Sequence, residues 1–326
     1  MKISKKLGCI SLLVLSPFAV AMQPLDDENL SEATGQSGIN VGIGVSKVQI
    51  DQLSIIDRDG LGTNPDYKNA ASLVLAGNIA GTASGQKFAL NFIGSTGSST
   101  INAVFDTDGG ARAPFANIAL SFDKNIKGIS LGPLGLYLAG VSSTSMPGMS
   151  KSIFTGTSRN SDVQKFLTAN NGIDINFGPS APTINLQLGN VPQSQFIKFA
   201  GSISSICGNG KGNSGTTGSG CGINIISDGG VGGDIGAKFD FMLSGSDKVQ
   251  GFSLSGFYAG VEPSGFVFGN TGESSKFDIG LNNVIMGNAG ATNTSGAFAN
   301  IQNGSMGNLG AVGTSVTDLK VRISGL

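Results

Sequence analysis

The sequence predicts an all-β fold, an elongated antiparallel β-sandwich or β-roll built from bent strands. The first observation is alternation, because Ile39, Val41, Ile43 and Val45 are separated by small or polar residues and alternate positions share one face of a strand. The second is composition, since the chain has 52 glycines and only 13% charged residues, and glycine is typical of turns. Similar apolar runs recur to the end of the chain, which favours β-structure throughout.

The first strand region, residues 38–56, is expected to bend. After Val45 the alternation skips a position, so the next apolar residues are Val48 and Ile50, followed after a second skip by Leu53 and Ile55. Each skip would turn the apolar residues to the opposite face of a straight strand. A bulge or corner at each skip would keep them on one face.

Residues 1–21 have the pattern of a secretory signal peptide. Three lysines within the first six residues precede an apolar stretch at residues 7–20, and residues 19–21 supply a small-x-small cleavage pattern. Cys9 lies before the apolar stretch, where a lipid-acceptor cysteine would not be placed. We therefore expect an exported chain, and no later stretch approaches the roughly 20 apolar residues of a membrane-spanning helix.

Residues 22–37 predict a short N-terminal helix. With Asp26 as the N-cap, Leu25 and Leu30 occupy the two positions of a hydrophobic staple. Acidic residues fill the first turn, where they complement the helix dipole, and Gly35 can end the helix. This segment is expected to cover one end of the β-core.

A second short helix is predicted at residues 161–171, the one interruption of the strand pattern. Ser161 and Gln164 have the spacing of a capping box. Asn171 suits the helix end. One helical face would carry Val163, Phe166 and Leu167.

This helix would connect a first β-half, residues 38–160, to a second β-half, residues 172–326. An internal similarity between residues 120–131 and residues 243–254 is consistent with two related halves. Chance similarity in a chain of biased composition explains the same observation equally well.

The cysteine and histidine content limits the chemistry. Without Cys9 two cysteines remain, Cys207 and Cys221, around a loop of glycine, asparagine, serine and threonine. In an exported chain this pair is expected to form a disulfide. The chain has no histidine, which argues against histidine-containing triads and histidine-ligated zinc. A hydrolase built on two distant carboxylates stays open, since no local pattern would mark it.

Two Asp-x-Asp-Gly stretches are candidate calcium ligands, with Asp57 and Asp59 in the first and Asp106 and Asp108 in the second. Carboxylates two residues apart suit a hard cation, but the further acidic ligands of an EF-hand loop are missing. The alternative is a turn between strands, for which Asp-Gly is a strong signal. Beyond this calcium candidate, no cofactor is expected.

The N-terminal segment resembles the FilA-type pilus-assembly or surface proteins of diderm bacteria. The resemblance covers about twenty residues. It implies a secreted, surface-exposed or fibre-associated role and supplies no catalytic residue. The matching positions are Pro24, Leu25, Asp26, Asp27, Glu28, Leu30, Ser31, Thr34, Gly35, Gln36, Gly38 and Ile39.

We therefore expect a secreted, cell-surface or pilus-associated structural or adhesive protein without catalytic activity. Its partners would be other pilus or surface proteins, or copies of itself joined through an exposed strand edge. Nucleic acid is not expected, because the formal net charge is -1 and no basic patch is visible. The alternatives are a periplasmic module that binds an apolar ligand between curved sheets and the carboxylate hydrolase.

Overall fold

The computed structural model describes most of the chain after residue 37. One compact unit spans Asn40–Leu326. The predicted signal peptide and the predicted helix at residues 22–37 lie outside the described residues. The described ranges are 38–60, 69–78, 86–94, 97–109, 113–140, 151–190, 194–226, 235–288, 290–292, 296 and 299–325.

The fold is all-β, as predicted, and the described residues contain no helix. The strands are β1 (Ile39–Val45), β2 (Lys47–Ile50), β3 (Gln52–Asp57), β4 (Ala71–Gly77), β5 (Phe88–Ile93), β6 (Ser99–Asp108), β7 (Phe115–Phe122), β8 (Gly128–Leu131), β9 (Leu134–Ala139), β10 (Phe154–Thr155), β11 (Ser158–Arg159), β12 (Val163–Ala169), β13 (Ile173–Phe177), β14 (Thr183–Gly189), β15 (Ile197–Ala200), β16 (Ser202–Ile206), β17 (Cys221–Ile226), β18 (Ile235–Gly245), β19 (Phe252–Ser253), β20 (Phe257–Glu262), β21 (Gly265–Asn270), β22 (Phe277–Met286), β23 (Leu309–Thr314) and β24 (Lys320–Ile323).

These strands form two large antiparallel sheets and one small hairpin. The first sheet has the order β1-β6-β7-β14-β15-β20-β21-β24. The second follows the path β2-β5-β8-β13-β16-β18-β17-β12-β9-β4-β3, with β19, β22 and β23 attached beside it. The hairpin consists of β10 and β11.

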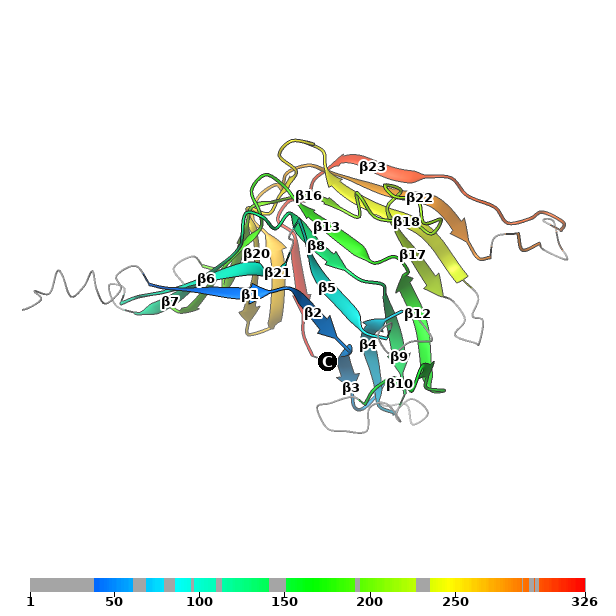
Figure 1. Cartoon of the computed structure of the whole chain (residues 1–326), viewed down its shortest axis with the longest axis horizontal. Coiled ribbons are helices and arrows are strands. Elements are labelled where there is room, and N and C mark those ends of the chain that lie inside the picture. Colours follow the sequence, from blue (N-terminus) through cyan, green and yellow to red (C-terminus); the bar gives the residue numbers. More distant parts are fainter. Residues whose placement is uncertain are drawn as a thin grey trace, which may run out of the picture. The chain divides into compact units, whose positions relative to one another are not determined.

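The strands of both large sheets follow one another along the chain in eight long stretches, which we call runs. Neighbouring runs are antiparallel, and each run contributes strands to both sheets. The first two runs illustrate the pattern, since β3 pairs with β4, β2 with β5 and β1 with β6. In Figure 1 the consecutive segments β1, β2 and β3 follow one another as one bent strand. The runs are β1-β2-β3, β4-β5-β6, β7-β8-β9, β12-β13-β14, β15-β16-β17, β18-β19-β20, β21-β22 and β23-β24.

Short interruptions bend the runs at the positions where the apolar alternation skips. The first run breaks at Ser46 and Asp51, which confirms the predicted bends. The third breaks at Gly132 and Pro133, and the fifth at Gly201. Gly201 has a φ of +85°, and a Cβ there would lie 2.3 Å from the carbonyl oxygen of Ala181. Only glycine fits this bend without strain.

The predicted helix at residues 161–171 is wrong, because this segment contains the strand β12. The strand pairs with β9 on one side and β17 on the other, so tertiary pairing overrides the local helix signal. A bulge between Lys165 and Leu167 inserts one residue into the alternation. The insertion produces the three- and four-residue spacing that resembles a helical face.

Two buried clusters lie on opposite faces of β4. The first is covered by the β10–β11 hairpin and contains Val74, Ala76, Tyr137, Ala139, Ile153 and Val163, with Phe154 packed against it. The second spans the bends that join β2 to β3, β4 to β5, β8 to β9 and β12 to β13. It contains Phe88, Leu134 and Ala169, with Ile50, Leu75, Leu131, Ile173 and Ile223 packed against them.

Candidate apolar binding face

Three rows of apolar side chains cross the sheets on one face, which we call the inner face. Directly opposed residues of antiparallel strands share a face, so the strand register defines each row. The first row is Phe105, Ile118, Leu186, Ile197, Ala259, Phe268 and Val321. The second is Phe92, Ile129, Ile175, Ile206, Leu243, Ile279 and Ala311. The third is Leu53, Leu75, Leu136, Leu167, Ile225, Ala237 and Met286.

Packing across the bends places the three rows on the same face. Phe92 of the second row lies against Phe122, with ring centroids 6.3 Å apart, and Phe122 shares its strand face with Ile118 of the first row. Leu75 of the third row packs on the buried cluster that contains Phe88. Phe88 lies four residues before Phe92 on β5 and so shares its face. The inner face therefore continues through both bends.

A second series of aromatic contacts joins the first two rows near the other side of the sheet. Phe268 of the first row stacks on Phe257 at 6.1 Å, and Phe257 lies 5.5 Å from Phe252. Phe252 in turn meets Phe277 edge to face at 5.3 Å. Since Phe277 and Ile279 of the second row share a face of β22, these rings connect the rows.

Much of the inner face is exposed to solvent, unlike a normal core. In the third row Leu53 is 52% exposed and Met286 is 50% exposed. Leu138, which shares its face with Leu136, is also 50% exposed. Of the row residues only Ala237 and Ala259 are buried. Large exposed apolar surfaces on a protein mark sites of interaction.

The three rows contain no charged side chain. Apart from Asp57, which shares the face of Leu53 at the end of β3, the charged residues of the same strands occupy the alternate positions, on the outer face. Lys198 lies between Ile197 and Phe199, and Asp278 lies directly before Ile279. The alternation therefore separates an apolar inner face from an outer face that is polar except where the β10–β11 hairpin covers the cluster of Val74.

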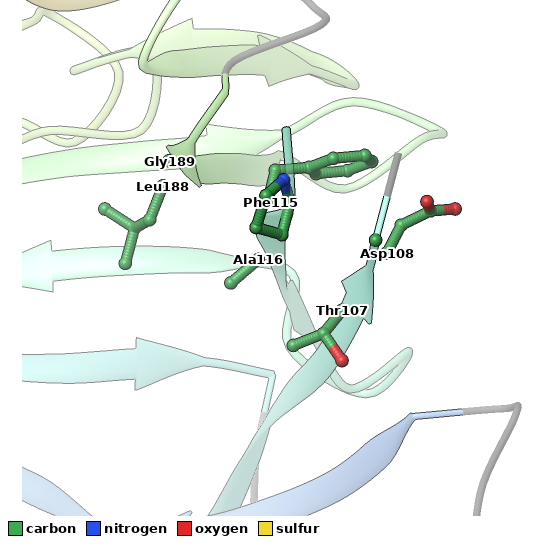
Figure 2. Close-up of a pocket in the computed structure, with 8 residues that line it drawn as sticks. Thr107, Asp108, Phe115, Ala116, Leu188 and Gly189 are labelled. Atoms are coloured by element: carbon green, nitrogen blue, oxygen red, sulfur yellow. The ribbon is translucent and has the colours of Figure 1, made fainter. Parts of the chain in front are cut away.

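A shallow pocket of about 480 Å³ lies where the inner face ends on the first sheet. Thr107, Ala116 and Leu188 are directly opposed there in β6, β7 and β14, as Figure 2 shows. The remaining lining residues are Asp108, Gly109, Pro114, Phe115 and Gly189. Its mainly apolar lining extends the inner face rather than forming a separate polar site.

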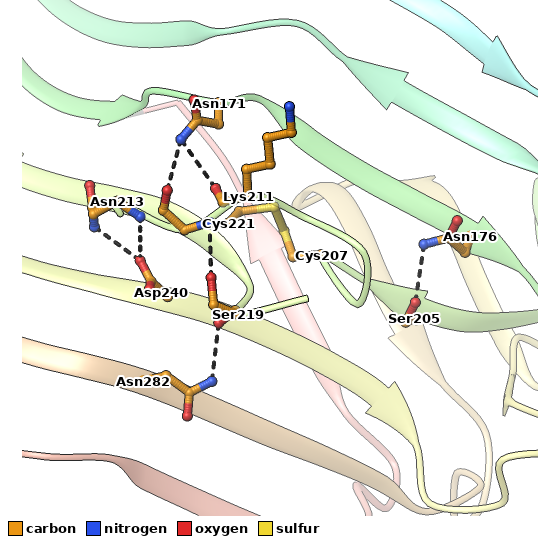
Figure 3. Close-up of a disulfide and its surroundings, with 11 residues drawn as sticks. Asn171, Asn176, Ser205, Cys207, Lys211, Asn213, Ser219, Cys221, Asp240 and Asn282 are labelled. Atoms are coloured by element: carbon orange, nitrogen blue, oxygen red, sulfur yellow. Dashed lines mark hydrogen bonds between the residues drawn. A yellow bond between two sulfur atoms is a disulfide. The ribbon is translucent and has the colours of Figure 1, made fainter. Parts of the chain in front are cut away.

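The predicted disulfide between Cys207 and Cys221 is present, with a Cα–Cα distance of 5.2 Å. Both cysteines are 1% exposed. The loop that they enclose connects β16 to β17 at a bend of the fifth run. Figure 3 shows the loop held by hydrogen bonds from Asn171 to the carbonyl oxygen of Gly212, at 2.8 Å, and from Asn282 to that of Ser219.

Asp240 also holds this loop in place through hydrogen bonds, and its side chain is 1% exposed. Its Oδ1 accepts a hydrogen bond from the backbone N–H of Asn213 at 2.7 Å, and its Oδ2 accepts one from Asn283 Nδ2 at 2.9 Å. A Cβ at Gly212 would lie 2.3 Å from that Oδ2, so the close approach of the loop requires glycine. These satisfied bonds give Asp240 a structural role.

The candidate calcium residues do not come together. Asp57 ends β3 and Asp59 follows it, at the end of the first two runs where β3 pairs with β4. Asp106 and Asp108 end β6, at the opposite end of the same two runs. Asp57 Oδ1 accepts hydrogen bonds from the backbone N–H groups of Asp59 and Gly60, both at 3.2 Å. These bonds lower the pKa of Asp57, as expected for an aspartate that closes a turn.

Each Asp-Gly stretch does separate antiparallel neighbours, because β3 pairs with β4 and β6 pairs with β7. The connections are longer than the two-residue turns that Asp-Gly favours, since β7 begins at Phe115. Asp106 Oδ1 accepts a hydrogen bond from the backbone N–H of Thr107 at 2.8 Å. The Asp-Gly stretches therefore do lie between antiparallel strands, as the turn interpretation predicts, but the connections are longer than tight two-residue turns.

Asp278 and Tyr137 also have shifted pKa values. The amine of Lys248, 2.8 Å from Asp278, lowers the pKa of Asp278, and Ser246 and the backbone N–H of Gly313 add to this effect. Burial raises the pKa of Tyr137 to about 12. Its hydroxyl donates a hydrogen bond to the carbonyl oxygen of Gly77 at 2.9 Å. Both groups lie on the outer face and support the fold.

Within the described ranges, no group of three or more histidine, cysteine, aspartate or glutamate side chains could hold a metal ion. The same residues include no helix long and apolar enough to cross a membrane. The inner face is thus the feature of the described chain that most clearly calls for a partner. Sequence alternation identified its strands, but the exposure depends on the bends and could not be read from the sequence.

The comparisons with known proteins leave the function open. Residues 1–106 match the model of a family described as "Family of unknown function (DUF6160)". No curated protein matches the chain. No solved structure matches it either.

Proposed function

We propose that this chain is an exported protein without catalytic activity that binds the acyl chains of a lipid on its inner face. The observation that carries the proposal is the set of three apolar rows, which contain no charge and are mostly half-buried or exposed. Acyl chains suit such a surface because they need neither hydrogen bonds nor a charged partner. The role corresponds to the predicted module that binds an apolar ligand between curved sheets.

The chemistry of the two faces favours a lipid over a polar macromolecule. The outer face of the strands carries residues such as Lys198, Lys238 and Asp278, while the inner face offers aliphatic and phenylalanine side chains. The backbone polar groups of the inner strands are paired within the sheets. A ligand that buries apolar area there gains about 25 cal/mol per Å².

Binding can be tested with a fluorescent fatty acid and two matched variants of the purified protein. Leu138→Glu places a charge among exposed inner-face residues, since Leu138 pairs with Leu73. We expect it to weaken binding at least about tenfold, because contact of a carboxylate with an acyl chain costs more than about 1.4 kcal/mol. Val312→Glu is the control, since Val312 is 85% exposed and alternates with Ala311 of the second row.

The two variants separate specific binding from general stickiness. Loss of binding in Leu138→Glu, with normal binding in Val312→Glu, supports the inner face as the site. Equal binding by both variants and the unmodified protein would contradict the proposal. Native mass spectrometry of the protein purified from its host should also reveal a bound lipid.

We propose as a second candidate the surface or pilus-associated structural role that the N-terminal resemblance implies. The observation that favours it is that the first and last strands of the eight-stranded sheet, β1 and β24, each have one neighbour among the described strands. Open edges are suited to pairing with other proteins. Antibody labelling of intact cells tests this role, and labelling only after the outer layer is opened would count against it.

A further inference from the structure

We infer that copies of this chain join head to tail, with β24 of one copy pairing with β1 of the next. The inference concerns the sheet edges and holds whether or not the inner face binds lipid. It depends on three observations: the direction of the two edge strands, the match of their faces, and the space beside β1.

The direction of the strands permits this pairing without turning either copy over. Neighbouring runs are antiparallel, and the described strands form eight of them, so the eighth run is antiparallel to the first. A second copy in the same orientation therefore places its β1 antiparallel to β24. Because the two joining edges differ, the contact is heterologous and can repeat to form a filament.

The inner faces of the two edges also match. β24 presents Val321, 43% exposed, from the first row, and Ile323, 63% exposed, from the same face. β1 presents Val41 and Ile43, 38% and 46% exposed, on its inner face. Antiparallel pairing would place these side chains side by side and continue the apolar surface from copy to copy.

The outer face of β1 leaves room for the long side chains of β24. Lys320 and Arg322 alternate with the apolar residues of β24 and so lie on its outer face. β1 carries Gly42 and Gly44 on its outer face, and a Cβ at Gly44 would meet no atom of the described residues within 4 Å. Lys320 Nζ pairs with Glu262 of its own sheet at 2.7 Å. The stem of Arg322 can cover these glycines while its charge stays in water.

The contacts of Gly42 identify the outer face of β1. A Cβ there would lie 3.5 Å from Thr100 Cγ2 and 4.0 Å from Asn102 Oδ1. Asn102 alternates with Ile101 and Ala103 on β6 and pairs with Ser121, so Gly42 belongs to the polar outer face. Val41 and Ile43 consequently belong to the inner face.

Cysteine cross-linking of the purified protein tests the pairing. The double variant Ile43→Cys/Val321→Cys carries one thiol at each edge on the inner face. We expect mild oxidation to give a ladder of dimers, trimers and larger species on a non-reducing gel, because directly opposed strand residues have Cβ atoms about 5 Å apart. Each single variant should give no ladder.

The control Gly42→Cys/Val321→Cys moves one thiol to the outer face of β1. We expect at least fivefold less multimer from it, since its thiols would lie on opposite faces of the joined sheet. An equal ladder from this control, dimers from Ile43→Cys alone, or no multimer from the inner-face pair at any concentration would each overturn the inference. The ladder should persist when Leu138→Glu is added, which distinguishes edge pairing from lipid binding.

Discussion

Removing the disulfide should destabilise the fold by about 3 kcal/mol. Cys207 and Cys221 are 14 residues apart, and closing a loop of this length removes about that much conformational free energy from the unfolded chain. The double variant Cys207→Ala/Cys221→Ala keeps the buried positions small and apolar. We expect its urea midpoint to fall by about 1 M relative to the unmodified protein.

A matched variant isolates the backbone at one of the two positions. Cys207 has a φ of +64°, a left-handed conformation that is unfavourable for residues with a Cβ by about 1–2 kcal/mol. Cys207→Gly/Cys221→Ala relieves this cost and loses some of the gain through the greater freedom of glycine when unfolded. It should therefore be more stable than the double alanine variant by about 1 kcal/mol.

The assay is urea unfolding followed by far-ultraviolet circular dichroism, with and without reductant. Reductant should lower the midpoint of the unmodified protein toward that of the double alanine variant and leave both variants unchanged. The reasoning would be refuted if reductant left the unmodified protein unaffected while mass spectrometry showed both thiols free. Equal stability of the alanine and glycine variants would refute the argument about the backbone.

Three further predictions concern the outer face and the core. Tyr137→Phe should cost about 1 kcal/mol at pH 7 through its lost hydrogen bond. The raised pKa of Tyr137 means that the folded state favours the neutral phenol, so the unmodified protein should lose stability between about pH 10 and 12. Urea unfolding at several pH values should show a smaller loss for Tyr137→Phe. The pKa of Asp278 is lowered instead, so the stability that its ionised form contributes is present above about pH 4 and is lost as the pH falls. Asp278→Asn should therefore flatten the acid side of a plot of unfolding free energy against pH. Val74→Ala, at a fully buried position, should cost about 2–3 kcal/mol in urea unfolding, whereas Val48→Ala, 38% exposed on the inner face, should cost below about 1 kcal/mol.

The strands were predictable because each local pattern agreed with its tertiary surroundings. Val45, Ile50 and Leu53 marked the two bends of the first run through skips in the alternation, and the structure places breaks at both skips. The disulfide was predictable because the pair remained after Cys9 was assigned to the leader. The signal for the bends lay within a few residues of them, whereas the disulfide prediction combined the spacing of the two cysteines with the leader at the start of the chain.

The helix prediction at residues 161–171 failed because a bulge and a helix can produce the same spacing. Val163, Phe166 and Leu167 fit a helical face, and only the pairing of β12 with strands on both sides shows that Phe166 lies at a bulge. Similarly, each row of the inner face joins residues from seven of the eight runs. No local pattern reveals which alternating face will remain uncovered.

The eight-run order affects how the chain acquires its structure. Every run after the first pairs with the run that precedes it in the sequence, so each newly synthesised run finds its neighbour already present. Short sequence separations between contacting segments speed folding. Structure can thus grow from the amino-terminal side toward the carboxyl-terminal side as the chain is synthesised, with β24 adding last among the described strands.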